Sequence, residues 1–395
     1  MKGALHGIKV VDLTRVIAGP YCSMILGDFG AEIIKVEKKG VGDLSRAFGP
    51  HYKGESTYFM TYNRNKKSIA IDFRHPKANE VLLSLIKDAD VLVENYKAGT
   101  LESMGLAPEK LLELNPRLII TRLSGFGQDG PYSKRTCFDA AAQSLSGLMD
   151  ITGDPNGDPV MMGIYVCDMT SGLYGVIGTL AALAARSHTG RGQVVDVALL
   201  DVACALTHSA IFDYYQLGKV MKRNGNQDRA SWPASFYKSK DGRLVFVHAG
   251  IDDTFAALCR HIGREDILKD ENFRTLAGRT KHINECDKLV ADWIGTCTAD
   301  EVVVACEKIG VTSAVVNNMA EMAQDKQLKH RKMIREVEHP VFGKMTMSGP
   351  VVKMSDTPAD VRYAPPSLGQ NNKEIFANLG YSNEEIAQME SEGVI

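Results

Sequence analysis

The sequence lacks any long run of charges of one sign. Its 395 residues include 46 lysines and arginines against 48 aspartates and glutamates, so the formal net charge is −2. A composition this balanced gives little support to a nucleic-acid partner or to binding at a charged membrane surface. We therefore expect neither partner.

Paired cysteines and metal-binding spacings are also missing. None of the eight cysteines stands in a C-x-x-C motif, and no cysteine–histidine cluster has the spacing of a zinc site. We expect no metal, and we interpret the cysteines as the reduced thiols of a cytoplasmic protein. The first seven residues lack the apolar core of a signal peptide, which agrees with a cytoplasmic location.

One apolar segment has to be weighed as a membrane anchor. Residues 169–185 carry no charge, but glycine, serine and threonine interrupt them. The segment also falls short of the roughly 20 apolar residues that a spanning helix needs. It therefore predicts a buried helix rather than a membrane span.

Several common catalytic and nucleotide-binding motifs are absent. The first predicted strand is followed by Thr-Arg-Val-Ile-Ala-Gly-Pro at 14–20, not by G-x-G-x-x-G, which removes the main support for a nicotinamide dehydrogenase. The sequence contains no Walker motif and no G-x-S-x-G nucleophile elbow. His188, His208 and His248 have no partner at motif spacing, so we interpret them as structural.

An alternation of strand and helix patterns occupies the first third of the chain. Short apolar strands and amphipathic helices follow one another, which predicts an α/β fold with a mostly parallel sheet covered on both faces. The expected strands are 9–13, 32–36, 68–73, 90–96 and 118–123, and the expected helices are 20–30 and 76–87.

The rest of the chain predicts a second, smaller domain. An irregular stretch at 205–235 has the composition of a linker, and the segments beyond it favour a small α+β domain. From residue 331 short strands with glycine and proline turns follow, and the chain ends in a polar tail. The expected elements are a helix at 168–189, strands at 193–200, 244–247 and 311–316, and a last helix at 372–379.

Asp168 is the sharpest candidate for chemistry. It stands at the start of the long helix, whose Gly172, Gly175 and Gly178 allow close packing against other backbone. A carboxylate there meets free N–H groups and the positive end of the helix dipole, which we expect to keep it ionised, as a nucleophile requires. An ordinary N-cap aspartate fits the same residues, so both interpretations are open at this point.

Two further segments suggest ligand contacts. Glu37 ends the second strand and is followed by Lys38 and Lys39, two cations that favour a nucleotide with an extra phosphate, such as the 3′-phospho-ADP of coenzyme A. A solvated pair of lysines explains them equally well. The glycine-rich loop 124–131 follows an apolar strand, so its N–H groups either meet an acyl oxygen or form only a tight turn.

Longer stretches distributed over the whole chain match a known family. They are 7–13, 18–20, 30–37, 65–69, 93–96, 123–127, Asp168 with its glycine helix, 189–193 and 378–381. On these residues the sequence resembles the family III CoA-transferases, which include formyl-CoA:oxalate and carnitine CoA-transferases. The α-methylacyl-CoA racemases share their fold.

The resemblance implies an enzyme that moves coenzyme A from an acyl-CoA donor to a free carboxylic acid. It places the family's nucleophilic aspartate on Asp168 and implies a ping-pong reaction through a mixed anhydride and an aspartyl-CoA thioester. Coenzyme A is then a substrate, and no tightly bound cofactor is expected. The family's CoA-binding positions fall on Val16, Ala18, Lys38, Ile71, Asn95 and Tyr96.

The resemblance also implies an architecture. Both ends of the chain, residues 1–205 and 330–395, would form a Rossmann-like large domain, and residues 225–325 a small α+β domain. The linkers would be 206–224 and 326–329, and two subunits would interlock as a homodimer.

Two departures from the family's patterns bear on the substrate. Oxalate-specific enzymes carry a glutamine where this chain has Ile17, and a run of glycines that is absent between residues 206 and 242, so oxalate is disfavoured. The racemases use a histidine where this chain has Phe138, which cannot move a proton. We therefore expect a CoA-transferase, with an α-methylacyl-CoA racemase or epimerase as the alternative. Asp168 disfavours a non-catalytic CoA-binding relative.

Overall fold

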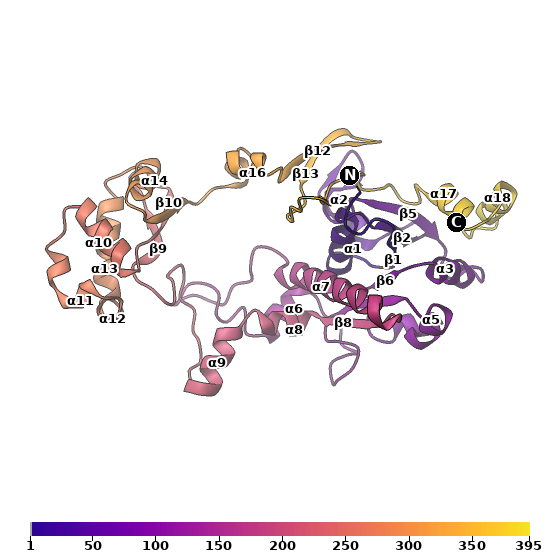
Figure 1. Cartoon of the computed structure of the whole chain (residues 1–395), viewed down its shortest axis with the longest axis horizontal. Coiled ribbons are helices and arrows are strands. Elements are labelled where there is room, and N and C mark those ends of the chain that lie inside the picture. Colours follow the sequence, from indigo (N-terminus) through magenta and orange to yellow (C-terminus); the bar gives the residue numbers. More distant parts are fainter. Residues whose placement is uncertain (1) are drawn as a thin grey trace. The chain divides into compact units, whose positions relative to one another are not determined.

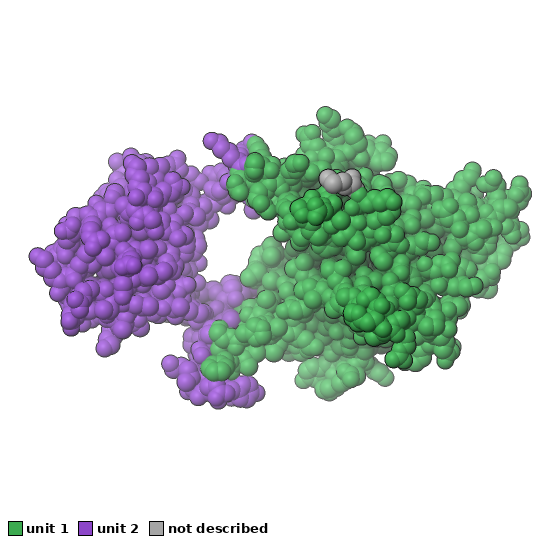
Figure 2. Space-filling view, viewed as in Figure 1, with its two compact units in different colours: residues 1–148, 162–212, 327–395 green, residues 149–161, 213–326 purple. Residues whose placement is uncertain are grey.

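The computed structural model describes residues 2–395, and Figure 1 traces the chain. The chain forms two compact units, which have different colours in Figure 2. Unit 1 contains the chain up to Leu148, together with Met162–Phe212 and Gln327–Ile395. Unit 2 contains Met149–Met161 and Asp213–Lys326. The short segment before Met162 thus groups with unit 2, which no feature of the sequence suggested.

Unit 1 is built on a six-stranded parallel sheet in the order β5-β2-β1-β6-β7-β8, so the predicted α/β class is confirmed. β1 lies between β2 and β6, which makes it the point where the strand order reverses. Ligands of open α/β sheets bind outside the carboxyl ends of the strands at such a point. The strands are β1 Lys9–Asp12, β2 Glu32–Lys38, β5 Lys66–Ile71, β6 Val91–Glu94, β7 Ile119–Ser124 and β8 Val194–Ala198.

Helices pack on both faces of this sheet because alternate strand residues point to opposite sides. On one face Val11 and Ile120 share a core with Val81 of α3, Leu111 of α5 and Phe376 of α17. α1 and α7 pack against each other and against the strands from the other side. The helices are α1 Ala18–Asp28, α3 Ala78–Lys87, α5 Pro108–Leu114, α7 Val166–Thr189, α17 Asn372–Asn378 and α18 Asn383–Ser391.

The glycines of α7 lie where other backbone and side chains come very close. A Cβ atom on Gly172 would be 2.8 Å from the carbonyl oxygen of Ala18, and one on Gly178 would be 2.5 Å from Cγ1 of Val195. α7 is apolar and long enough to cross a membrane by composition alone, but it packs against α1, β7 and β8 as a core helix. The interpretation of 169–185 as a helix of the globular core is confirmed.

Unit 2 is a small antiparallel sheet with helices. Val245 on β10 shares a core with Val290 on α13 and Val302 on α14. Its sheet has the order β11-β10-β9. Its main elements are β9 Ala234–Lys238, β10 Leu244–His248, α10 Asp252–His261, α13 Ile283–Ile294, α14 Ala299–Lys308 and β11 Thr312–Val315.

The remaining elements are short. Up to residue 217 they are a 3-10 helix Leu44–Ala47, β3 His51–Tyr52, β4 Glu55–Ser56, α2 Thr57–Thr61, α4 Thr100–Ser103, α6 Asp139–Leu145, α8 Leu199–Ala205 and α9 His208–Leu217. In the second half they are a 3-10 helix Ile267–Lys269, α11 Glu271–Arg274, α12 Leu276–Arg279, α15 Met319–Met322, α16 Lys326–His330, β12 Ile334–His339 and β13 Gly343–Ser348.

The structure corrects two of the expected segments. The stretch 205–235 is not wholly irregular, because it contains α9, none of whose residues is buried. The polar tail contains α18, whose N-terminus carries a capping box between Ser382 and Glu385 and which buries Ile386 and Met389. The S-x-x-E spacing is a helix-start signal that was visible in the sequence.

Candidate active site

The loop between β1 and α1 is held in an unusual conformation at the carboxyl edge of the sheet. Val16 has φ +71°, a left-handed conformation that is a genuine outlier for a β-branched residue. The side chain of Asn95 accepts the N–H of Arg15 at 2.8 Å and donates to its carbonyl oxygen at 2.7 Å. Asp43 accepts the N–H of Val16 at 3.0 Å. Asn95 and Asp43 thus hold the strained loop from two sides.

Buried ion pairs support this loop from below. Lys35 pairs with Asp43 at 2.9 Å and donates to the carbonyl oxygen of Thr14 at 2.8 Å. Asp12 pairs with Lys66 at 3.0 Å, and although burial opposes ionisation, the charges of Lys66 and Lys35 lower the pKa of Asp12 to about 2. Removing one partner of such a buried pair typically costs about 3–5 kcal/mol, so the base of the site is rigid.

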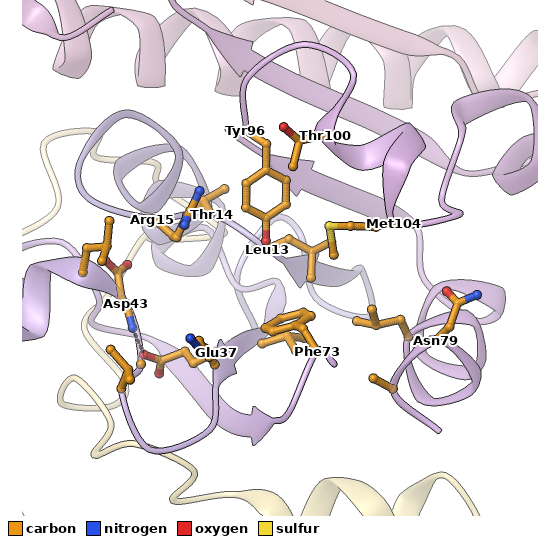
Figure 3. A pocket seen from close by; sticks show the side chains of 17 residues that line it. Leu13, Thr14, Arg15, Glu37, Asp43, Phe73, Asn79, Tyr96, Thr100 and Met104 are labelled. Carbon is orange, nitrogen blue, oxygen red and sulfur yellow. Dashed lines mark hydrogen bonds between the residues drawn. The ribbon is translucent and has the colours of Figure 1, made fainter. Parts of the chain in front are cut away.

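Two adjoining cavities open around the loop. The larger, about 400 Å³, lies at the ends of β1, β2 and β6 (Figure 3). The rings of Tyr96 and Phe73 enter it from opposite sides, and the exposed Lys38 lines it. Glu37 also lines it but is bound by Arg46 through two hydrogen bonds of 2.8 Å. Glu37 is therefore occupied and is not available to a ribose hydroxyl as in nicotinamide enzymes.

The second cavity, about 250 Å³, contains Asp168. It shares Arg15, Leu44 and Tyr96 with the first cavity, so the two spaces adjoin. Its lining brings together Asp168 and the predicted coenzyme A contacts Val16, Ala18, Asn95 and Tyr96, together with Ile17 and Phe138.

The predicted contact Ile71 is placed differently from the others. Its side chain is fully buried in the core of unit 1 and lines neither cavity. Its carbonyl oxygen accepts the N–H of Lys39 at 2.9 Å.

Asp168 is not the N-cap of α7. The helix begins at Val166, and the carboxylate of Asp139, which comes from α6, accepts the N–H groups of Cys167 at 2.7 Å and of Asp168 at 3.1 Å. Within residues 2–395 no hydrogen bond is found to the carboxylate oxygens of Asp168. The expectation that the helix end keeps Asp168 ionised is therefore wrong, because another carboxylate already occupies those N–H groups.

The surroundings of Asp168 raise its proton affinity. Burial, and after it the charge of Asp139, raise the pKa of Asp168 to about 7. Phenol rings stand beside it: Tyr58 packs edge-on against Tyr165 and Tyr62, with ring centroids 6.0 Å and 5.7 Å apart. Burial raises the pKa of Tyr58 and of Tyr62, and the charge of Asp168 adds to it. The nucleophile candidate thus lies in partly apolar surroundings, next to a second carboxylate.

Loop 124–131 closes the far side of the second cavity. A Cβ atom on Gly125 would be 2.1 Å from Cβ of Cys137, so only glycine lets the following loop pack here. The turn is bonded internally, since Ser124 accepts the N–H of Gly127 at 3.0 Å. Gly125 therefore has a packing role, and it also lines the cavity.

Three cations in the second cavity were missed by the sequence reasoning. Arg15, Lys97 and Arg135 line it, and none of them has an ion-pair partner in the part of the chain that the structure describes. Arg15 stacks on Tyr96 at 4.9 Å, and Arg135 on Tyr132 at 4.1 Å. No sequence spacing brings these residues together, because they follow three different strands.

Comparisons with known proteins were consistent along the whole chain. A sequence profile described as CoA-transferase family III matches residues 5–372. The chain is 37% identical to a succinyl-CoA–D-citramalate CoA-transferase of Chloroflexus aurantiacus, covering 99% of this chain and 98% of the relative. It is 38% identical to a human succinyl-CoA:glutarate CoA-transferase, covering 99% and 90%. The crystal structure of a CAIB/BAIF family protein from Brucella suis superposes with a TM-score of 0.86 at 33% identity, covering 96% and 100%.

Proposed function

Because the chain belongs to CoA-transferase family III, and so transfers coenzyme A between an acyl-CoA and a carboxylic acid, we propose that Asp168 is the covalent nucleophile of this transfer. The observation that carries the proposal is the free carboxylate of Asp168, which no hydrogen bond holds within residues 2–395 and which lines the second cavity. A carboxylate with a pKa near 7 is also a stronger nucleophile than an ordinary aspartate, because nucleophilicity rises with basicity.

The proposed reaction has four balanced steps. The Asp168 carboxylate attacks the thioester carbonyl of the donor and expels coenzyme A as a thiolate, which leaves a mixed anhydride. The thiolate attacks the aspartyl carbonyl and releases the donor acid, which leaves an aspartyl-CoA thioester. The acceptor carboxylate then attacks this thioester and expels the thiolate, forming a second anhydride. Attack of the thiolate on the acceptor's acyl carbonyl forms the new acyl-CoA and regenerates Asp168.

The two cavities give coenzyme A a place in this scheme. We assign its nucleotide to the larger cavity, where Lys38 offers a charge to a phosphate at the rim. The pantetheine arm would pass Arg15 and Tyr96, which line both cavities, and bring the sulfur to Asp168. Val16 and Ala18 would contact this arm. Asn95 would act through the loop, because its amide is engaged with Arg15.

The acids exchanged are proposed to be dicarboxylic. The relatives named above carry succinyl, citramalate and glutarate in their names. Unpaired cations in the second cavity agree with an anionic substrate. Incubating the enzyme with a panel of acyl-CoAs and free acids, and reading new CoA esters by mass spectrometry, tests the class. New esters formed only from monocarboxylic acids would overturn it.

The racemase alternative finds no support in the lining of the site. A racemase must remove the α-proton of its thioester with a positioned base. Phe138 lines the second cavity in the segment where the racemases carry a histidine, and it is 69% exposed. Its ring offers no atom that accepts a proton.

We also propose that the enzyme works as an interlocked homodimer in the cytoplasm. The outer face of α7 exposes Leu173, Tyr174 and Ile177, an apolar stripe that a second subunit would cover. All eight cysteines are free thiols, as is usual in a reducing compartment.

A further inference from the structure

Asp139 is a buried carboxylate that binds the backbone of the nucleophile. It is the first residue of α6, and it is only 2% exposed. One of its oxygens accepts both the N–H of Cys167 at 2.7 Å and the N–H of Asp168 at 3.1 Å. First-turn N–H groups of a helix have no partner within the helix itself. Here a side chain from a different helix supplies that partner.

Gln143 completes the arrangement one turn further along α6. Its amide nitrogen donates to the second oxygen of Asp139, and its amide oxygen accepts the N–H of Met162 at 3.1 Å. Gln143 is 1% exposed. Through these hydrogen bonds Asp139 and Gln143 link α6 to the segment before α7 and to the first turn of α7.

We propose that Asp139 is the positioning residue of the transfer reaction: it fixes the backbone of Asp168 and places a second carboxylate beside it. This inference rests on the proposed role of Asp168 as nucleophile. An anion next to the nucleophile disfavours the resting carboxylate more than the neutral anhydride or thioester that replaces it. Asp139 thereby favours formation of the covalent intermediates, which carry no charge at Asp168.

The charges around Asp168 single out Asp139. The titratable and charged groups that face Asp168 or line its cavity are Asp139, Cys137, Cys167, Tyr58, Tyr62, Tyr165, Arg15, Lys97 and Arg135. Among them, Asp139 is the only charge that moves the pKa of Asp168, which burial and then Asp139 raise to about 7. The reaction should consequently lose rate as the pH falls below about 7.

The neighbouring amide allows the charge to be separated from the hydrogen bonds. In the double variant Asp139→Asn/Gln143→Glu, the asparagine oxygen still accepts the two N–H groups and its nitrogen donates to the new carboxylate. The other oxygen of that carboxylate accepts the N–H of Met162. Every hydrogen bond is kept, and the negative charge moves one helical turn away. Asp139→Asn alone removes the charge, and Asp201→Asn, an exposed acid on α8, is the control for net charge.

The measurement is the rate of acylation by acyl-CoA in a single turnover, followed from pH 5 to pH 9. We expect the midpoint near pH 7 in the wild type and in Asp201→Asn, and a midpoint about one unit lower in the double variant and in Asp139→Asn. In these two variants the ratio of the acylation rate at pH 6 to the rate at pH 8 would then be about fivefold higher than in the wild type. A double variant with the wild-type midpoint would overturn the role of Asp139, whatever its stability.

The two proposals fail in different ways. If the wild-type enzyme forms no acyl adduct on Asp168, the proposed function itself is wrong. If the adduct forms but the midpoint of the double variant stays at the wild-type value, only the role assigned to Asp139 is wrong.

Discussion

Replacing Asp168 by asparagine is expected to abolish transfer and to make the folded protein more stable at alkaline pH. Asparagine removes the nucleophile, and such losses typically reduce kcat on the order of 10⁴ to 10⁶. It breaks no hydrogen bond, because the carboxylate oxygens of Asp168 accept none within residues 2–395. It also removes a half-buried negative charge next to Asp139.

The sign of the stability change follows from the pKa of Asp168. Burial and Asp139 raise this pKa from 3.8 to about 7, so the folded state holds the proton more tightly than the unfolded state. Below about pH 4 both states are protonated and the carboxyl group carries no penalty. The penalty grows as the pH rises from about 4 to about 7, because the unfolded chain releases this proton while the folded protein still holds it, and it stays constant above about pH 7. At 1.36 kcal/mol per pKa unit, the raised pKa of Asp168 corresponds to a loss of about 4 kcal/mol of folding stability at most. Because Asp168 is only half-buried, solvent screening reduces this loss to about 1–2 kcal/mol.

Denaturant unfolding of both proteins between pH 5 and pH 8.5 measures this difference. The asparagine variant should gain stability relative to the wild type as the pH rises from 5 to about 7, and Asp356→Asn, which changes an exposed acid in a loop, should show no comparable trend. If Asp168 were an N-cap, the results would differ. Asp168→Asn would then leave the stability unchanged at every pH, and Asp168→Ala would reduce the free energy of unfolding by about 1 kcal/mol. A stability gain of Asp168→Asn that is the same at pH 5 and pH 8.5, or a loss of stability in Asp168→Asn or in Asp168→Ala, would contradict the raised pKa of Asp168.

Three further outcomes are expected. Lys38→Glu should raise KM for acyl-CoA without changing the fold, and the effect should shrink at high salt because Lys38 is exposed; an unchanged KM would remove Lys38 from the binding site. The α-proton of 2-methylacyl-CoA should not exchange with solvent deuterium on the enzyme, since Phe138 offers no base, and rapid exchange would favour the racemase. Light scattering at low concentration should find a dimer, and an active monomer would contradict the interlocked assembly.

The sequence was sufficient to predict the parts of the fold that depend on apolar runs. The strands around Val11, Ile34 and Ile120 lie within one residue or two of their expected bounds, because each is a short, fully or half-buried strand between turns. α9 was missed although Ile211, Tyr214 and Tyr215 stand at helical spacing in the sequence. α18 was missed although its capping box was present in the sequence.

The candidate site was only partly predictable. The position of Asp168 at the start of α7 follows from local sequence and family resemblance, but its electrostatics do not. The raised pKa depends first on burial and then on Asp139, which is 29 residues away in sequence and reaches the α7 N–H groups only in the folded chain. The four-residue spacing of Asp139 and Gln143 on a helix is a weak signal, since it does not say what the two side chains bind. Ile71 remains a predicted contact, and because its side chain is buried in the core, any contact with coenzyme A would be made by its backbone.

The central claim is that the acyl group passes through Asp168, and the most direct test is to trap it there. Wild-type enzyme is given acyl-CoA without an acceptor acid, then treated with borohydride, which reduces an activated aspartyl carboxyl to an alcohol, and peptide mass mapping locates the product. We expect a reduced residue at Asp168 that is absent from Asp168→Asn and from enzyme given no acyl-CoA. Reduction at another carboxylate, or full transfer activity in Asp168→Ala, would contradict it.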